Sequence, residues 1–257
     1  MWRQGPGGKK IELFNKHIQQ VKSFLDQKRS EGRIVESCCR EKTRWPESTN
    51  KTLVLGHDTA VELGSPKQAS TSFLLWTNRE SAIQSGRITI VGPDIPDIPA
   101  RQTAFGKIVI VGGSDFNEEN SYQRYRAMER VRYNVHLEGY MMRGASQFQR
   151  EWSRVSRDAM KKGFSLHTLG RALMGKYFEL EFVTAVEIIF ITSATEDVLE
   201  MRCISDNAMK IICAMNKMAG EMSFDCDTCE YADVCGDVAA LRAMRKTYMK
   251  EERTTHA

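Results

Sequence analysis

The chain has 257 residues, of which 41% are hydrophobic and 27% charged, and its net charge is +4 at pH 7. This composition is typical of a globular protein with one large α/β domain or two small ones, and the small net charge gives no reason to expect nucleic acid. The apolar run AVEIIFI is far shorter than the ~20 residues of a membrane-spanning helix. The N-terminus has no signal-peptide pattern, so we expect a cytoplasmic chain with reduced cysteines and no membrane contact.

The first predicted element is an amphipathic helix at residues 9–31, ending near Gly32. Its apolar side chains recur every three or four residues: Ile11, Phe14, Ile18, Val21 and Leu25. Residues 36–51 are polar and contain Pro46, which favours a loop or a short helix. We therefore expect residues 1–50 to form an N-terminal helix and linker.

The middle of the chain favours short strands. Residues 52–63 predict a strand or a hairpin around Gly56. Residues 92–99 contain three prolines and predict an irregular, extended loop. Further strands are predicted for the β-branched runs at residues 72–77, 87–92 and 106–113.

Helices dominate the rest of the chain. Asn117 or Asn120 can cap a helix that runs to about Tyr140. Ser193 and Glu196 fit a capping box. The other predicted elements are a short helix from Ser156 to Gly163, a helix at residues 167–178, a buried strand at 185–192, a helix through about Ala219 and a last helix at 237–250. This order predicts an α/β fold of mixed α+β layers, with one unit at residues 51–222 and a cysteine motif with a helix at 223–257.

Three cysteines, Cys226, Cys229 and Cys235, lie within ten residues near the C-terminus. A C-x2-C turn directs two sulfurs at one metal centre, and a [4Fe–4S] cluster takes four thiolate-type ligands. Cys213 or Cys203 on the preceding helix could supply the fourth. Structural zinc is an alternative, as are cysteines without metal. A redox-active dithiol is disfavoured, because the neighbouring aspartates raise the thiol pKa.

Basic residues are concentrated at residues 124–162, which suggests a face for an acidic redox protein or a nucleotide-like cofactor. The alternative is a solvated helix face. The arginines concerned are Arg124, Arg126, Arg130, Arg132, Arg143, Arg150, Arg154 and Arg157.

Several motifs together resemble a known family. They are AVELGSPKQASTSFLLW, GRITIVGPDIPDIP, REWSRVSRDAMKKGF and VEIIFIT, and in this order they resemble the middle region of CO-methylating acetyl-CoA synthase, the β subunit of the CO dehydrogenase/acetyl-CoA synthase complex. The most specific motif is W-x-R-V-S-[KR]-D-A-x-x-K-G-F, which runs from Trp152 to Phe164. The resemblance extends over residues 55–235.

This resemblance implies an α/β middle domain that docks partners and approaches coenzyme A, followed by a [4Fe–4S] cluster bridged to two nickel sites. It implies cluster ligation by Cys226 and Cys229, and by Cys235 at a shorter spacing than in the family. Coenzyme A contacts are expected at Arg143, Arg150, Trp152 and Arg154, although the family's tryptophan before Trp152 is not matched. The family's fourth cluster cysteine and its nickel-binding Cys-Gly-Cys have no counterpart, so we do not expect this chain alone to make acetyl-CoA.

These observations lead to three hypotheses. The first is an iron–sulfur protein of anaerobic one-carbon or acetyl-CoA metabolism, acting in electron transfer or docking with a larger metalloenzyme or a ferredoxin-like protein. The second is an acetyl-CoA synthase-type enzyme subunit that a nickel-carrying partner chain completes. The third is a binding module stabilised by zinc.

Overall fold

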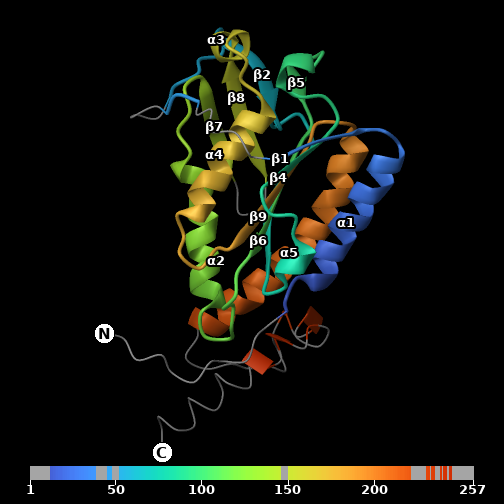
Figure 1. Cartoon of the computed structure of the whole chain (residues 1–257), viewed down its shortest axis with the longest axis vertical. Coiled ribbons are helices and arrows are strands. Elements are labelled where there is room, and N and C mark those ends of the chain that lie inside the picture. The colour runs from blue at the N-terminus through green and yellow to red at the C-terminus, as the bar shows by residue number, and fades with distance from the viewer. Residues whose placement is uncertain are drawn as a thin grey trace, which may run out of the picture.

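The computed structural model describes residues 12–38, 45–47, 52–145 and 150–220, and also residues 230–231, 233–234, 238, 240–241 and 243–244. It has two mixed β-sheets flanked by helices, which confirms the predicted α/β class (Figure 1). No helix within these ranges is long and apolar enough to cross a membrane.

The larger sheet has the strand order β1-β4-β9-β6-β3. Its strands are β1 (Ile34–Cys38), β4 (Arg87–Val91), β9 (Ala185–Ile191), β6 (Phe105–Gly112) and β3 (Ser70–Thr77). β3 is parallel to β6 and β4 to β9, whereas β6 and β9 are antiparallel. Every residue of β3, β6 and β9 is buried, which explains their nearly continuous apolar sequences.

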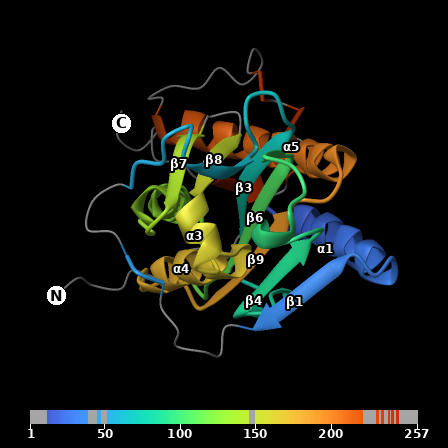
Figure 2. The same cartoon turned by 90° about the horizontal axis from the view of Figure 1, so that it is seen from above.

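Helices cover both faces of the larger sheet. The helices of the described residues are α1 (Asn15–Ser30), α2 (Ser121–Arg130), α3 (Arg157–Lys161), α4 (Leu166–Phe178) and α5 (Thr195–Gly220), with 3-10 turns η1 (Glu80–Ala82), η2 (Ile95–Asp97) and η3 (Val131–Asn134). α1 and α5 lie together on one side, and α4 lies on the other (Figures 1 and 2). On the α4 side, Gly170 permits a close approach, since a Cβ there would lie 2.8 Å from Ile88 Cδ1.

The smaller sheet has the order β5-β2-β8-β7. Its strands are β5 (Gln102–Thr103), β2 (Thr59–Leu63), β8 (Glu151–Ser156) and β7 (Tyr140–Ala145). Burial alternates along β8, so that Glu151, Ser153 and Val155 face the interior. The Ser70 hydroxyl of β3 donates to the Glu151 carbonyl oxygen at 2.6 Å and thereby joins the two sheets.

Two strand predictions need correction. Residues 34–38, predicted in part as a loop or short helix, form β1, because they pair with β4 from Ile34 opposite Val91 to Cys38 opposite Arg87. This strand joins the N-terminal segment to the sheet of residues 51–222. Of the strand or hairpin predicted around Gly56, a strand does form at Thr59–Leu63, but it pairs with β5 and β8 and not in a hairpin around Gly56.

The helix predicted to run to about Tyr140 ends at Arg130 and continues only as the turn η3. Residues 140–145 and 151–156 form β7 and β8, which local sequence did not indicate, because their pairing partners are each other and β2. The basic segment is therefore not one solvated helix face. The Arg132 side chain is largely buried, and Arg154 lies on β8.

The other predicted helices and strands are largely confirmed. The Ser156 hydroxyl caps α3 by accepting from the Ala159 N–H, as predicted. At α5 the capping box is not formed as expected, since the Ser193 hydroxyl donates to Asp197 rather than bonding near Glu196. The first helix begins at Asn15 instead of residue 9, and the irregular loop at 92–99 includes the turn η2. The last predicted helix lies mostly outside the described residues.

Candidate functional site

Three of the four residues expected to contact coenzyme A come together on the smaller sheet. Trp152 and Arg154 lie on the face of β8 opposite to the buried Glu151. The guanidinium carbons of Arg143 and Arg154 lie 4.7 Å and 5.3 Å from the centre of the Trp152 ring. At such distances the ring attracts both cations, so these three side chains form a stack, called the Arg–Trp–Arg stack below.

A β-bulge places Arg143 in this stack. Met142 lies opposite Ser153 and Gly144 lies opposite Trp152, so that Arg143 is an additional residue in β7. A bulge of this kind redirects a side chain at the edge of a sheet. Arg143 is exposed, and it forms no ion pair with a carboxylate among the described residues. Within the described residues, no carboxylate therefore competes for its guanidinium donors.

Arg154 is held more firmly than Arg143. Its Nε lies 2.7 Å from Glu62 Oε1, and Gln102 donates to Glu62 Oε2 at 2.9 Å. Arg154, Glu62 and Gln102 are direct cross-strand neighbours on β8, β2 and β5. The Glu62 and Arg154 side chains are only 6% and 14% exposed. Glu62 and Gln102 therefore hold Arg154 in place, and Glu62 adds a carboxylate beside the stack.

Arg150, the fourth expected residue, is not part of the stack. It precedes β8 and donates to the backbone oxygen of Gln68 at 3.3 Å. The indole Nε1 of Trp152 is buried and has no hydrogen-bond partner within the described part of the chain. The site thus presents guanidinium groups, which favour an anion, beside a buried indole N–H that has no acceptor among the described residues.

Beneath the stack lies a buried ion pair that sequence reasoning missed. Glu151, next to Trp152, pairs with Lys107 of β6, and Ser72 donates to the same Glu151 oxygen at 3.1 Å. The side chains of Lys107 and Glu151 are 5% and 0% exposed. Burial lowers the pKa of Lys107, partly offset by Glu151. One signal was available in the sequence, namely a lysine inside the apolar run of residues 106–113.

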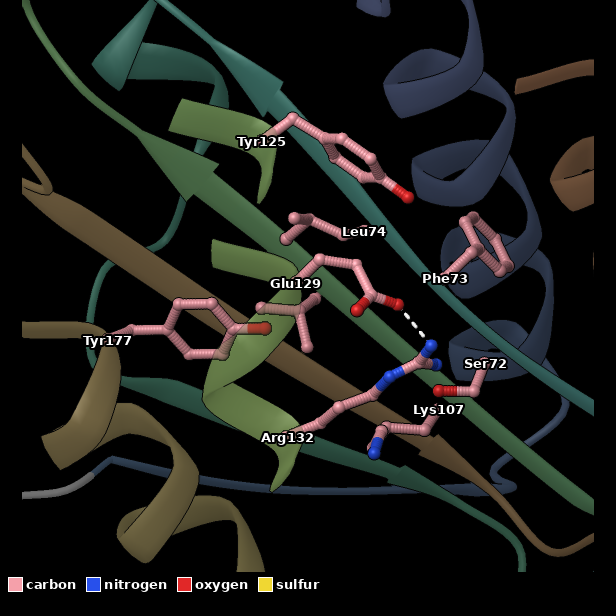
Figure 3. Close-up of a pocket in the computed structure, with 9 residues that line it drawn as sticks. Ser72, Phe73, Leu74, Lys107, Tyr125, Glu129, Arg132 and Tyr177 are labelled. Atoms are coloured by element: carbon pink, nitrogen blue, oxygen red, sulfur yellow. Dashed lines mark ion pairs between the residues drawn. The ribbon is translucent and has the colours of Figure 1, made fainter. Parts of the chain in front are cut away.

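A small cavity adjoins this ion pair. Figure 3 shows the Glu129–Arg132 pair over Lys107 and Ser72, with Tyr125 and Tyr177 on the opposite side. Burial raises the pKa of Glu129, and the positive charge of Arg132 offsets part of this increase. The volume is about 20 Å³, enough for a single water molecule. The cavity is therefore too small for a substrate.

The predicted metal ligands are placed only in part. Cys226, Cys229 and Cys235 lie outside the described residues. Cys213 is half-buried on α5, whereas Cys203 on the same helix is exposed. Tyr231 lies within hydrogen-bonding reach of Cys213, and burial together with the Cys213 and Glu230 side chains raises the pKa of Tyr231 to about 12. Residue 231, which falls between Cys229 and Cys235 in the sequence, thus lies beside Cys213.

Comparison with known proteins finds relatives that match about half of this chain. Over 145 residues the chain is 33% identical to the carbon monoxide dehydrogenase/acetyl-CoA synthase subunit alpha of Moorella thermoacetica, covering 54% of this chain and 18% of that protein. It is 30% identical over 139 residues to the acetyl-CoA decarbonylase/synthase complex subunit beta 2 of Methanosarcina thermophila, and 31% identical over 139 residues to the subunit beta of Methanothermobacter thermautotrophicus. The alignments with these two Methanosarcina and Methanothermobacter proteins each cover 53% of this chain and 28% of the relative.

A family model, that of the CO dehydrogenase/acetyl-CoA synthase complex beta subunit, matches residues 51–198. The match includes Arg143, Arg150, Trp152 and Arg154 but ends before Cys213, although the sequence resemblance was expected to extend to residue 235. Since the matched residues make up more than half of the chain, it belongs to the CO dehydrogenase/acetyl-CoA synthase complex beta subunit family.

Proposed function

We propose that this chain provides a coenzyme A contact surface for an acetyl-CoA synthase-type enzyme. The observation that carries the proposal is the Arg–Trp–Arg stack, in which Arg143 and Arg154 lie over Trp152. Family membership supports it, because the matched relatives are named for acetyl-CoA synthesis or cleavage. The alignments cover 18% and 28% of those relatives, and in this proposal a partner chain carrying nickel completes the reaction.

The chemistry of the stack suits the phosphates of coenzyme A. A guanidinium presents paired N–H donors that match two phosphate oxygens, and stacking on an aromatic ring keeps the donor edge free. Arg143 would supply this edge, since no described carboxylate competes for it. Trp152 would orient Arg143 through the contact of its ring with the guanidinium group.

Isothermal titration of the purified chain with coenzyme A tests this role. Arg143→Gln should weaken binding at least about tenfold, because hydrogen bonds to charged groups contribute roughly 1.5–3 kcal/mol. Arg143→Lys should restore only part of the affinity, since an ammonium lacks the planar fork. Arg126→Gln is the matched control, because Arg126 is exposed on α2 and contacts Tyr122 at 3.5 Å. Equal losses in both glutamine variants, or no binding by the unmodified chain, would refute the proposal.

A second candidate function is an iron–sulfur centre that serves electron transfer or docking in the same complex. The contact of Tyr231 with Cys213 favours it, because it brings the segment between Cys229 and Cys235 to a thiol on α5. Cys213 would be the fourth ligand beside Cys226, Cys229 and Cys235. When bound, such a cluster would exchange one electron at a time with a redox partner.

Metal analysis of protein purified without oxygen distinguishes the possible centres. A [4Fe–4S] centre predicts about four irons per chain and broad visible absorbance. Cys213→Ser should reduce the iron content, whereas Cys203→Ser should not, since Cys203 is exposed at another point of α5. Colourless protein with one zinc per chain would instead favour the zinc-stabilised module.

A further inference from the structure

The two sheets differ in how their edge strands are protected. β3 is buried along its whole length, β5 has two residues, and β7 carries the bulge at Arg143. Bulges, covering elements and very short strands are the usual means of preventing edge-to-edge pairing. β1 has none of the bulges, prolines or lysines that protect edges, and its Val35 side chain is 62% exposed.

The register of β1 shows which backbone groups are available on its outer side. The Gly92 N–H donates to the Arg33 oxygen at 3.1 Å, so these opposite residues form a hydrogen-bonded pair. Such pairs alternate along an antiparallel ladder. Val35 and Ser37 therefore bond to β4, whereas Ile34, Glu36 and Cys38 direct their N–H and C=O groups outward.

We propose that β1 pairs with β1 of a second copy of this chain, antiparallel about a two-fold axis at Glu36. In this register Glu36 bonds to Glu36 of the second copy, and Ile34 bonds to Cys38 of the second copy and the reverse. All outward groups of one strand meet their complements, as an isologous dimer requires. If the two-fold axis passed between two residues instead of through one such as Glu36, the outward N–H and C=O groups of one strand would not lie opposite those of the other.

Charge and access also fit this pairing. Two facing glutamates would repel each other, but Glu36 lies 2.6 Å from Arg29 Nη2 and 3.0 Å from Arg87 Nη1. Each copy would thus bring its own cations to the axis. Among the described residues, an open groove of about 510 Å³ also lies beside Ile34 and Val35. The short strands predict a weak dimer, at the small end of specific interfaces.

Sedimentation of the full chain over a concentration series tests the dimer. Val35→Lys adds an edge lysine without changing the backbone and should raise the dissociation constant about tenfold, because cross-strand pairs are lost on both sides of the axis. Leu53→Lys is the matched control, since Leu53 is 71% exposed and lies outside β1. A monomer at all concentrations, or an equal effect of both lysines, would overturn the proposal.

Disulfide trapping tests the register itself. In the proposed pairing, Val35 lies opposite Ser37 of the second copy in a non-hydrogen-bonded pair, with Cα atoms roughly 4.5 Å apart. This separation permits a disulfide. Mixing the Val35→Cys and Ser37→Cys chains should yield a 35–37 cross-link, identified by peptide mass, at a level well above that in either chain alone. Absence of this cross-link under mild oxidation would exclude the register.

Discussion

The buried Lys107–Glu151 pair allows a quantitative prediction. Glu151→Gln keeps the size of the side chain but leaves the Lys107 charge without its counter-charge in a site where both side chains are at most 5% exposed. Breaking a buried pair from one side costs about 3–5 kcal/mol. For a chain of this length, a loss of ~3 kcal/mol corresponds to a decrease in Tm of roughly 6–12 °C.

The pH dependence of the variant's stability tests whether the uncompensated Lys107 charge causes the loss. Burial already lowers the pKa of Lys107, and loss of Glu151 lowers it further. The unfolded chain then binds more protons than the folded chain between the folded and unfolded pKa of Lys107, so the variant's stability should rise with pH across that window. The difference from the unmodified chain should therefore be smaller at alkaline pH than at pH 7.

Urea unfolding followed by circular dichroism measures these differences. Lys107→Met combined with Glu151→Leu is the control, because replacing both partners of a buried pair by apolar groups is often nearly neutral. The double variant should therefore lose less stability than Glu151→Gln alone. The reasoning is refuted if Glu151→Gln costs less than about 1 kcal/mol, or if its cost does not decrease with rising pH.

Two further predictions concern the Lys28–Asp197 ion pair between α1 and α5, and Gly92, which follows β4. Lys28→Met removes the ion pair with Asp197 (2.7 Å) and should cost about 1.5–3 kcal/mol at pH 7 by urea unfolding. Burial raises the pKa of Asp197, but the hydrogen bonds from Lys28 and Ser193 and the charge of Lys28 together outweigh burial and lower this pKa. The stabilisation should therefore disappear as pH falls through the folded pKa of Asp197, and a difference that persists in strong acid would contradict this account. Gly92→Ala should cost about 1–3 kcal/mol, because φ is +103° and a Cβ would lie 2.5 Å from the Ser193 nitrogen. Gly86→Ala, with φ +81° and no atom within 4 Å, should cost less by the same assay, since it adds backbone strain without a clash.

Local sequence determined much of the framework. The strands β3, β4, β6 and β9 were predicted from their apolar runs, because strands buried on both faces need apolar side chains throughout. The motif beginning at Trp152 indicated the family and drew attention to Arg143 and Arg154. Three of the four expected contact residues do lie at one end of the smaller sheet, with Arg150 directed to Gln68 instead.

Only the tertiary structure decided the remaining features. β1, β7 and β8 have few local signals, and they form strands because distant segments offer hydrogen-bonding partners. Likewise, the lysine within the apolar run of residues 106–113 does not identify Glu151 as its partner, since the two residues lie 44 positions apart and meet only when the sheets pack together. Periodicity and capping act between neighbouring residues and can be read from the chain, whereas pairing across sheets depends on contacts that form only on folding.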